Sequence, residues 1–214
     1  VRTLTFGTSE ADDASCANVE LDELGCAHGT ATLPSGASMQ LDLGLPGVHN
    51  VSDALAAAAM GDLLGIAAEQ ISQALAGLRL EGNRQQVVLC AAGITLINDC
   101  YNANADSMRR ALDVLCSLKA TRRIACLGDM GELGQLTVQA HRDMGALTRR
   151  LGLTAVAVGE KMHALTETDP QAQWFATVEE AMPAIRQLFT PGTAVLVKAS
   201  HAMHFESIVK ELEK

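Results

Sequence analysis

The stretch Ile94-Thr95-Leu96-Ile97-Asn98-Asp99-Cys100-Tyr101-Asn102-Ala103-Asn104 shows the pattern on which the fold of most of this chain is built. Its first four residues form a short apolar run, typical of a strand buried in a sheet. Polar, turn-forming residues follow at once, and 107–118 then has the pattern of a helix, capped by Asp106 or Ser107. This order of strand, polar loop and helix favours a parallel α/β sheet.

The same order recurs as far as residue 212. Apolar runs predict further strands at 123–127, 155–158, 174–176 and 194–197. Helical patterns lie between and after them, at 137–151, 161–166, 178–189 and 205–212. We therefore predict an α/β fold with a mostly parallel sheet and helices on both of its faces.

Residues 1–82 follow a different pattern. Over 1–46, short alternating runs broken by Gly, Asp and Pro predict β-hairpins or the edge of a sheet, and helices are expected at 50–64 and 67–78. Residues 1–82 also carry two basic and eleven acidic side chains, whereas 83–214 carry fourteen of each. The net charge of −9 thus lies wholly in the first segment, which indicates a domain boundary near Gly82-Asn83.

Composition argues against several classes of protein. The 214 residues are 48% hydrophobic and 19% charged, as in ordinary soluble proteins, and no apolar run is long enough to span a bilayer. The acidic balance argues against nucleic acid or an anionic membrane as the partner. The six cysteines lack metal-knuckle spacing and fit small buried side chains in a reducing cytoplasm. A start at Val1 without a Met or a signal peptide indicates the middle of a longer chain, and we expect a cytoplasmic monomer.

Three polar segments, 98–104, 128–134 and 198–201, follow predicted strands. In a parallel sheet the ligand crevice lies at the carboxyl ends of the strands, so these segments are expected to converge on one crevice. The first offers a carboxylate for ribose hydroxyls, carboxamides that donate and accept, and the aromatic face of Tyr101 for a purine. The alternative is that Asn, Asp and Gly are here ordinary loop residues.

Five segments in chain order resemble signatures of the Mur ligase family. Asp99-Cys100-Tyr101-Asn102-Ala103-Asn104-Ala105-Asp106-Ser107-Met108 is similar to the D-S-Y-N-A-N-P-D-S-M of its MurF-type members, and 127–134 with His141 to their L-G-D-M-x-E-L-G…H. The others are 47–54, similar to G-x-H-N-x-x-N-A, 82–84, similar to the G-R after the linker, and 197–200, similar to V-K-G-S-R. They cover most of 45–205, and 1–44 carries no specific motif.

The resemblance implies that 1–82 is the C-terminal portion of a central ATPase domain, that 83–214 is a Rossmann-like C-terminal domain, and that ATP lies between them. Asn50 would approach adenine, Arg84 the phosphates and Asp99 the ribose. The full nucleotide-binding set carried over is Asn50, Asp53, Arg84, Asp99, Tyr101, Asn102 and Asn104. The acceptor-binding set is Lys198, Ser200 and His201, with Asp129 and His141 shaping that side.

Some of these residues have simpler explanations. They are a helix cap for Asn50, a solvated linker charge for Arg84, a turn residue for Asp129 and a main-chain partner for His141. His201 and His204 have a spacing that suits a shared metal. No carboxylate or cysteine stands at a matching spacing, so we expect no metal site there.

Four positions differ from the family pattern. Asp53 replaces the second Asn of H-N-x-x-N and would place an acidic group near the nucleotide. Ala105 replaces Pro, which relaxes its loop. Ala199 replaces Gly, so a positive φ there would be costly. His201 replaces Arg, which would make a contact with the dipeptide dependent on pH.

The resemblance implies the C-terminal part of an ATP-dependent amide ligase, which joins D-alanyl-D-alanine to UDP-MurNAc-tripeptide through an acyl phosphate in peptidoglycan synthesis. The chain has no G-x-x-x-x-G-K-[ST] phosphate loop, so we expect it to be inactive alone, with the Mg²⁺ ligands upstream. Two alternatives stay open. One is another Mur-like amide ligase, tripeptide-forming or folylpolyglutamate-type, and the other is a non-catalytic module that binds a nucleotide or a partner.

Overall fold

The computed structural model describes residues 3–80 and 82–213, and the chain divides into two compact units. Unit 1 is Val1–Leu80 and unit 2 is Glu81–Lys214. Each unit has its own buried hydrophobic core, as expected of separate domains. Val1 and Arg2, where the sequence suggests the middle of a longer chain, lie outside the described residues.

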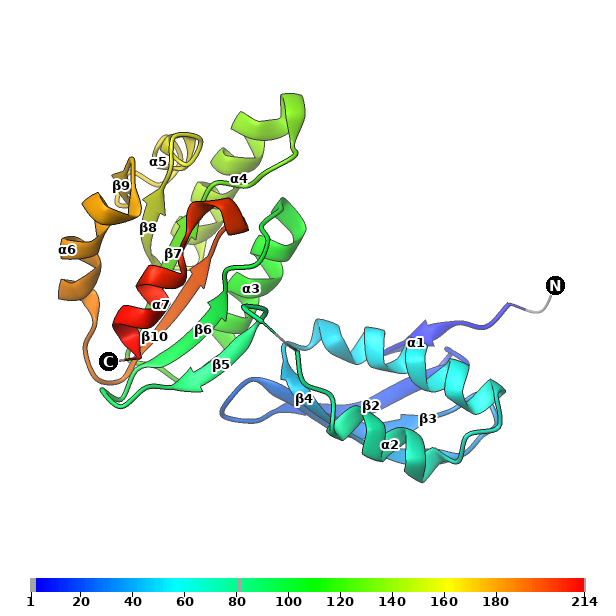
Figure 1. Ribbon diagram of the computed structural model, residues 1–214. Helices are drawn as coiled ribbons and strands as arrows, with labels where there is room; N and C mark the ends of the chain where they lie inside the picture. The colour runs from blue at the N-terminus through cyan, green and yellow to red at the C-terminus, as the bar shows by residue number, and fades with distance from the viewer. Residues whose placement is uncertain (1–2, 81, 214) are drawn as a thin grey trace. The chain divides into compact units, whose positions relative to one another are not determined.

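Unit 1 is a four-stranded sheet with two helices packed on one face (Figure 1). The strands follow the order β1-β2-β3-β4; β2, β3 and β4 are antiparallel, and β1 pairs with β2 in parallel. This confirms the hairpins expected over 1–46. The bounds are β1 Phe6–Gly7, β2 Ala14–Leu21, β3 Cys26–Thr32, β4 Ser38–Pro46, α1 His49–Leu63 and α2 Ala68–Ala76. Met39, Leu41 and Leu43 alternate along β4 and meet Val51 and Leu55 of α1 in the core.

Unit 2 is built on a six-stranded sheet with the order β5-β6-β10-β7-β8-β9. All neighbours are parallel except β5, which pairs with β6 antiparallel, so the mostly parallel sheet is confirmed. The bounds are β5 Gln86–Leu89, β6 Thr95–Asp99, β7 Arg122–Gly128, β8 Thr154–Val158, β9 Gln173–Phe175 and β10 Thr193–Lys198. The sequence did not predict β5, whose edge position leaves Val88 40% and Leu89 69% exposed and so gives no buried apolar pattern.

Helices cover both faces of this sheet (Figure 1). One face packs against α3 Ala105–Ser117, α4 Thr137–Arg150 and α5 His163–Thr166, and the other against α6 Val178–Leu188 and α7 Glu206–Leu212. Two short 3-10 turns, η1 Gly134–Leu136 and η2 His201–Met203, follow β7 and β10. Along β10, Ala194 and Leu196 enter one core and Val195 and Val197 the other. Burial on both faces explains why this strand is a continuous apolar run.

The cap of α3 lies at Asn104, so the expected cap at Asp106 or Ser107 was wrong by two to three residues. Asn104 Oδ1 accepts from the backbone N–H of Ser107 at 2.8 Å, and Ser107 Oγ accepts from the N–H of Asn104 at 3.1 Å. This is a capping box, in which each side chain satisfies the other residue's main chain. Asp106 instead pairs with Arg110 one turn along the helix.

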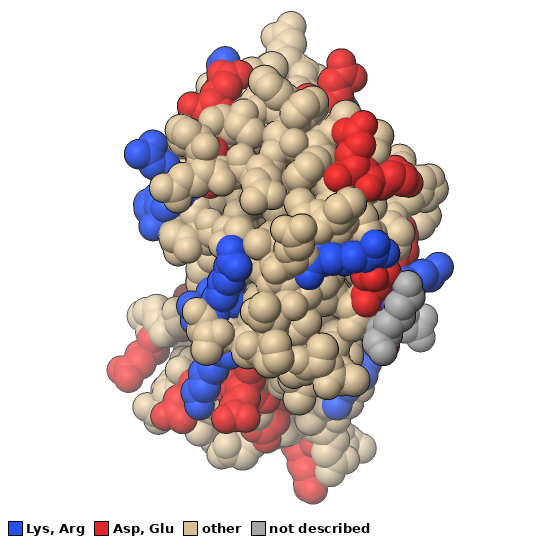
Figure 2. All heavy atoms as spheres, turned by 90° about the vertical axis from the view of Figure 1, so that its left-hand side faces the viewer, with Lys and Arg blue, Asp and Glu red and all other residues tan. Residues whose placement is uncertain are grey.

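The surface of unit 2 carries charges of both signs. Figure 2 shows Lys and Arg side chains interspersed with Asp and Glu on the side of the fold where α6 lies. Within residues 3–80 and 82–213, no helix is long and apolar enough to cross a membrane.

His28 on β3 lies between two carboxylates of unit 1. Its Nδ1 is 2.8 Å from Asp42 Oδ1 on the neighbouring strand β4, and its Nε2 is 3.5 Å from Asp22 Oδ2 in the β2–β3 turn. The hydrogen bond to Asp42 is the main reason why the pKa of His28 is raised above its ordinary value; burial opposes this, and Asp22 adds to it.

An NMR titration of the His28 ring is therefore expected to give a midpoint above the ordinary value of about 6.5, and Asp42→Asn is expected to lower that midpoint. Because the pKa of His28 is raised in the folded state, the charged pair gives its full stabilisation of unit 1 at pH values below the ordinary pKa. This stabilisation is lost as the pH rises through the raised pKa. The contribution to the free energy of unfolding is below about 1 kcal/mol, because the pair is exposed. A midpoint that Asp42→Asn leaves unchanged contradicts this assignment.

Candidate functional site

The three polar segments lie along one edge of the sheet of unit 2. Strand β10 runs in parallel between β6 and β7, and its last residue, Lys198, stands opposite Asp99 of β6 and Leu127 of β7. The segments that follow these strands therefore leave the sheet at the same edge, as the sequence predicted. We call this the carboxyl edge.

Lys198 and Asp99 form a buried ion pair at this edge. The side chain of Lys198 is 1% exposed and that of Asp99 9%, and Lys198 Nζ donates to Asp99 Oδ2 at 2.6 Å. Lys198 Nζ also donates to the carbonyl of Asn102 at 2.8 Å, and Asp99 Oδ1 accepts from the backbone N–H of Gln85 at 3.3 Å. Lys198 thus lies beneath the 99–104 loop, whereas the sequence led us to expect it facing the acceptor. The sequence also gave no sign of the part played by Gln85.

Above this pair, Arg84 and Tyr101 form an exposed stack. The guanidinium of Arg84 lies over the ring of Tyr101, 3.8 Å from its centroid, and Tyr101 is 48% exposed. The backbone N–H of Tyr101 donates to the carbonyl of Asn83 at 3.1 Å, which fixes the segment before β5 against the loop. Arg84 is therefore not a freely solvated linker charge, and its cation–π contact presents a flat cationic surface.

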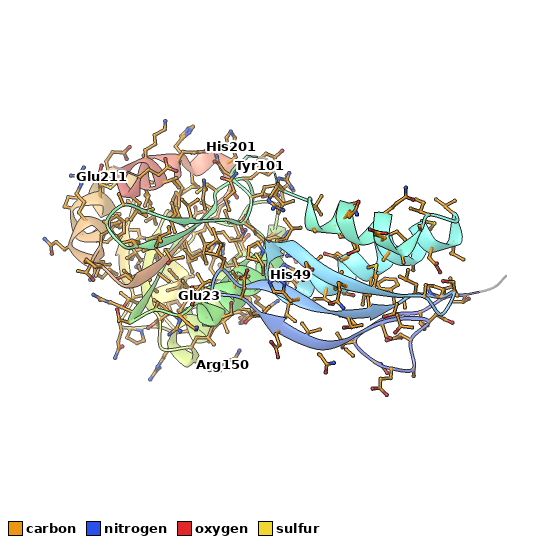
Figure 3. All side chains as sticks on the ribbon, turned by 90° about the horizontal axis from the view of Figure 1, so that it is seen from below. Glu23, His49, Tyr101, Arg150, His201 and Glu211 are labelled. Carbon is orange, nitrogen blue, oxygen red and sulfur yellow. The ribbon has the colours of Figure 1, made fainter. Side chains whose placement is uncertain are left out.

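His201 lies beside Tyr101, with 6.2 Å between the ring centroids (Figure 3). Its side chain is 70% exposed, and its Nδ1 is 3.2 Å from Glu206 Oε1. Glu206 also accepts from the side chain of Asn83 at 3.4 Å. The sequence did not point to Glu206, because nothing in its helix marks it as a partner of the turn before it.

Ser200 has an unsatisfied hydroxyl. Its Oγ is buried and has no hydrogen-bond partner, while its backbone N–H donates to the carbonyl of Asp129 at 3.4 Å. Ala199, which stands where the family has Gly, does not have a positive φ, so this replacement causes no backbone strain. Positive φ instead occurs at His204, just beyond the η2 turn, and at Glu132, in the segment after β7.

Asp129 and His141 make hydrogen bonds to neighbouring loop segments. Asp129 accepts from the backbone N–H groups of Met162 at 2.9 Å and Lys161 at 3.3 Å. His141 is 0% exposed; its Nε2 accepts from the N–H of Met130 at 3.1 Å, and its Nδ1 is 2.7 Å from the carbonyl of Thr137. These partners require the neutral tautomer with the proton on Nδ1. Both residues thus make main-chain contacts of the kind that the simpler explanations from the sequence allowed.

Asn102 and Asn104 are exposed at the carboxyl edge. Asn102 Oδ1 accepts from the N–H of Ala103 at 2.8 Å, and Asn104 caps α3. Between them and the sheet, the thiol of Cys100 donates to the carbonyl of Val197 at 3.4 Å, and burial raises its pKa to about 12. The thiol therefore stays protonated and does not serve as a nucleophile.

Asn50 and Asp53 lie on α1 of unit 1, and the other ten candidates belong to unit 2. Asn50 does not cap the helix, because the cap position is Val48; its side-chain amide donates to the carbonyl of Pro46 at 2.7 Å. This leaves its amide oxygen to accept. Asn50 and exposed Asp53 border a pocket of about 100 Å³ whose other walls are apolar.

Comparison with known proteins now gives the family. A family model described as "Mur ligase, glutamate ligase domain" matches residues 83–201, more than half of the chain. The chain belongs to the Mur ligase family.

Two curated relatives of this Mur ligase chain share one name. The UDP-N-acetylmuramoyl-tripeptide--D-alanyl-D-alanine ligase of Bacillus subtilis (strain 168) is 31% identical over 220 residues, covering 99% of this chain and 47% of the relative. The ligase of the same name from Escherichia coli (strain K12) is 32% identical over 194 residues, covering 88% and 42%. The chain thus spans about half the length of the curated relatives that it matches.

Solved structures agree with this Mur ligase fold. Crystal structure I of MurF from Acinetobacter baumannii superposes with a TM-score of 0.88 at 32% identity, covering 98% of this chain and 46% of that one. The MurF ligase from Thermotoga maritima in complex with ADP gives a TM-score of 0.80 at 19% identity, covering 98% and 48%. The second likeness shows the fold alone.

Proposed function

We propose that this chain is the C-terminal part of an ATP-dependent ligase that joins D-alanyl-D-alanine to UDP-MurNAc-tripeptide in peptidoglycan synthesis. The observation that carries the proposal is the Arg84–Tyr101 stack at the carboxyl edge, because it offers a cation and an aromatic face beside the ion-paired 99–104 loop. The likeness to a UDP-N-acetylmuramoyl-tripeptide--D-alanyl-D-alanine ligase, 31% identical over 99% of this chain, supports the choice of reaction. Residues 1–82 would then be the end of the central ATPase domain, and 83–214 the complete C-terminal domain.

Each unit has polar groups that would contact a nucleotide. Arg84, fixed over Tyr101, keeps N–H donors that suit phosphate oxygens. Asp99, whose buried carboxylate pairs with Lys198, would lie near the ribose. Exposed Asn102 and Asn104 would complete the nucleotide wall and border the acceptor. In unit 1, the amide oxygen of Asn50 and the carboxylate of Asp53 would both accept from N–H donors of a base.

The acceptor dipeptide would meet the loop that follows β10. The exposed imidazole of His201 is the polar group there that is open to a ligand. The hydroxyl of Ser200 is buried but has no hydrogen-bond partner, so we propose it as the second contact. Asp129 and His141 would act only by holding the neighbouring segments in place. In the whole protein, the tripeptide carboxylate would become an acyl phosphate, which the amine of the dipeptide attacks with release of phosphate. The contribution of this chain is positioning and charge.

Magnesium is not assigned to this chain. Within the described residues, no group of three or more His, Cys, Asp or Glu side chains is placed to hold a metal. We propose that the Mg²⁺ ligands of such a ligase lie in the part of the whole protein outside this chain. The six cysteines are free thiols, which suits a reducing cytoplasm. We further infer a monomer that acts there on soluble substrates, without nucleic acid or membrane as a partner.

A ligase with another acceptor, or a binding module without chemistry, is the competing proposal. A ligation assay of the whole protein with D-Ala-D-Ala, diaminopimelate, lysine and glutamate separates these possibilities. We expect turnover with D-Ala-D-Ala, and none by the 214-residue chain alone. Turnover with another of these acceptors instead refutes the proposed acceptor, and ATP binding without any turnover favours the binding module. Turnover by the isolated 214-residue chain refutes the expectation that it needs the rest of the whole protein for activity.

Substitution of Arg84 tests the nucleotide side. In the whole protein, Arg84→Met is expected to raise the KM for ATP by about tenfold or more, because a charge-assisted contact with a phosphate contributes about 1.5–3 kcal/mol. The matched control is Arg109→Met on α3, an exposed arginine away from the stack, which should leave the KM unchanged. An equal KM in the two variants rules out this role for Arg84.

A further inference from the structure

Lys198 is a charged side chain with almost no exposure, and its surroundings explain how it stays buried. An isolated buried ammonium is costly, so its donors need acceptors close by. Two are present: the carboxylate of Asp99 at 2.6 Å and the carbonyl of Asn102 at 2.8 Å. At 1% side-chain exposure, Lys198 does not reach a ligand at the surface.

These two acceptors connect Lys198 to both halves of the exposed stack. The carboxylate of Asp99 accepts from the backbone N–H of Gln85, the neighbour of Arg84 in the chain. The carbonyl that accepts from Lys198 belongs to Asn102, the residue that follows Tyr101 in the chain. Gln85 has a φ of +43°, an uncommon conformation for a side-chain-bearing residue that needs such fixed surroundings. One ammonium group therefore holds both segments whose side chains meet above it.

We propose that Lys198 is a positioning residue, which contacts no substrate and sets the Arg84–Tyr101 stack through Asp99 and the carbonyl of Asn102. The effect of Lys198 on catalysis rests on the function proposed above, whereas its effect on the position of the Arg84–Tyr101 stack does not. The role differs from the acceptor contact that the sequence suggested, because the ammonium points into the sheet edge and not out of it.

The chain offers a direct reporter, because it has one tyrosine and one tryptophan. With 3-fluorotyrosine incorporated, the ¹⁹F NMR signal reports on Tyr101 alone. We expect Lys198→Met to shift and broaden this signal, and Lys210→Met, at an exposed lysine of α7, to leave it unchanged. With 5-fluorotryptophan, the signal of Trp174, bonded to the carbonyl of Gly159 at 2.8 Å, should stay in place in both variants. An unmoved Tyr101 signal in Lys198→Met overturns the proposal.

A double variant separates positioning from simple stabilisation. Lys198→Met combined with Asp99→Leu removes both buried charges, and such replacements are often neutral or stabilising. We expect the stability lost in Lys198→Met to return in the double variant. The Tyr101 signal should remain displaced, because Gln85 has lost its carboxylate acceptor and Asn102 its ammonium donor. Return of both the stability and the original signal shows that the pair only balances charge, and it overturns the proposal.

Kinetics of the whole protein give the functional readout. We expect Lys198→Met to lower kcat/KM for ATP by about a hundredfold, as for a group displaced by about 1 Å, and to leave the KM for D-Ala-D-Ala unchanged. A raised KM for the dipeptide with an unchanged kcat/KM for ATP indicates direct contact and overturns the proposal. Absence of ligation by the unsubstituted whole protein refutes the proposed function instead, and the ¹⁹F spectra then still decide whether Lys198 positions the stack.

Discussion

Replacing Gly145 with alanine is expected to destabilise unit 2 by about 3 kcal/mol or more, the upper range for an overpacked core. Gly145 lies inside α4, where the helix packs against α5. A Cβ at this position would overlap the carbonyl oxygen of Leu165 and Oγ1 of Thr168. The carbonyl belongs to the main chain of α5 and has little freedom to move. The clash therefore outweighs the gain of about 1 kcal/mol that alanine brings within a helix.

Urea unfolding followed by the fluorescence of Trp174, which lies in unit 2, measures this loss. The matched control is Gly61→Ala in α1 of unit 1, where the new Cβ would meet flexible side-chain ends, Ile71 Cδ1 at 3.1 Å and Ile66 Cδ1 at 3.9 Å. The control should change the free energy of unfolding of unit 1, followed by circular dichroism, by less than about 1 kcal/mol. A Gly145→Ala protein with unchanged stability shows that α4 and α5 can separate freely, contrary to the packing described here.

Replacing Gly128 with alanine is expected to cost about 1–3 kcal/mol and to act at the site itself. Gly128 ends β7, and a Cβ there would lie 2.6 Å from Cβ of Ala199 and 2.7 Å from Cζ of Phe205. Adding Ala199→Gly removes the first of these contacts but not the ring of Phe205. We therefore expect the double variant to recover part of the loss.

A double-mutant cycle measures this coupling from the unfolding free energies of the two single variants and the double variant. Residues in contact are expected to show a coupling of at least about 0.5 kcal/mol. Strict additivity contradicts the contact between the segments after β7 and β10. The outcome also bears on the family resemblance, because Ala199 stands where the related signature has Gly, and Gly128 leaves room for its methyl group.

The order and type of most elements of unit 2 could be predicted from the sequence, because its strands are buried on both faces and stand out as apolar runs. Strand β10 is entirely buried and its apolar run was recognised, whereas β5 is a half-exposed edge strand and was missed. The cap of α3 was misplaced because Asn104, Asp106 and Ser107 are all residues that favour this position. Local patterns thus gave the elements but not their exact ends.

The carboxyl edge could be predicted for the same reason, because parallel strands end together. The direction of each side chain could not. Whether Lys198 faces outward or lies beneath a loop depends on its register with Asp99, 99 residues earlier in the chain. The inward direction of His141 on α4 likewise depends on a partner elsewhere in the fold. Its Nε2 accepts a hydrogen bond from the backbone N–H of Met130, in the segment after β7. Such pairings arise from tertiary packing, which leaves no periodic signal in the sequence.

Strand β10 is near the end of the chain and yet occupies the middle of its sheet. Strands β6 and β7 never pair with each other, so while the chain is being synthesised they have no common neighbour until residues 193–198 have left the ribosome. Closing such long loops is slow and exposes apolar strand edges meanwhile. The carboxyl edge of unit 2 is therefore completed only after β10 has been synthesised, and we expect a nascent chain that ends before Thr193 to leave two separate half-sheets open to proteolysis.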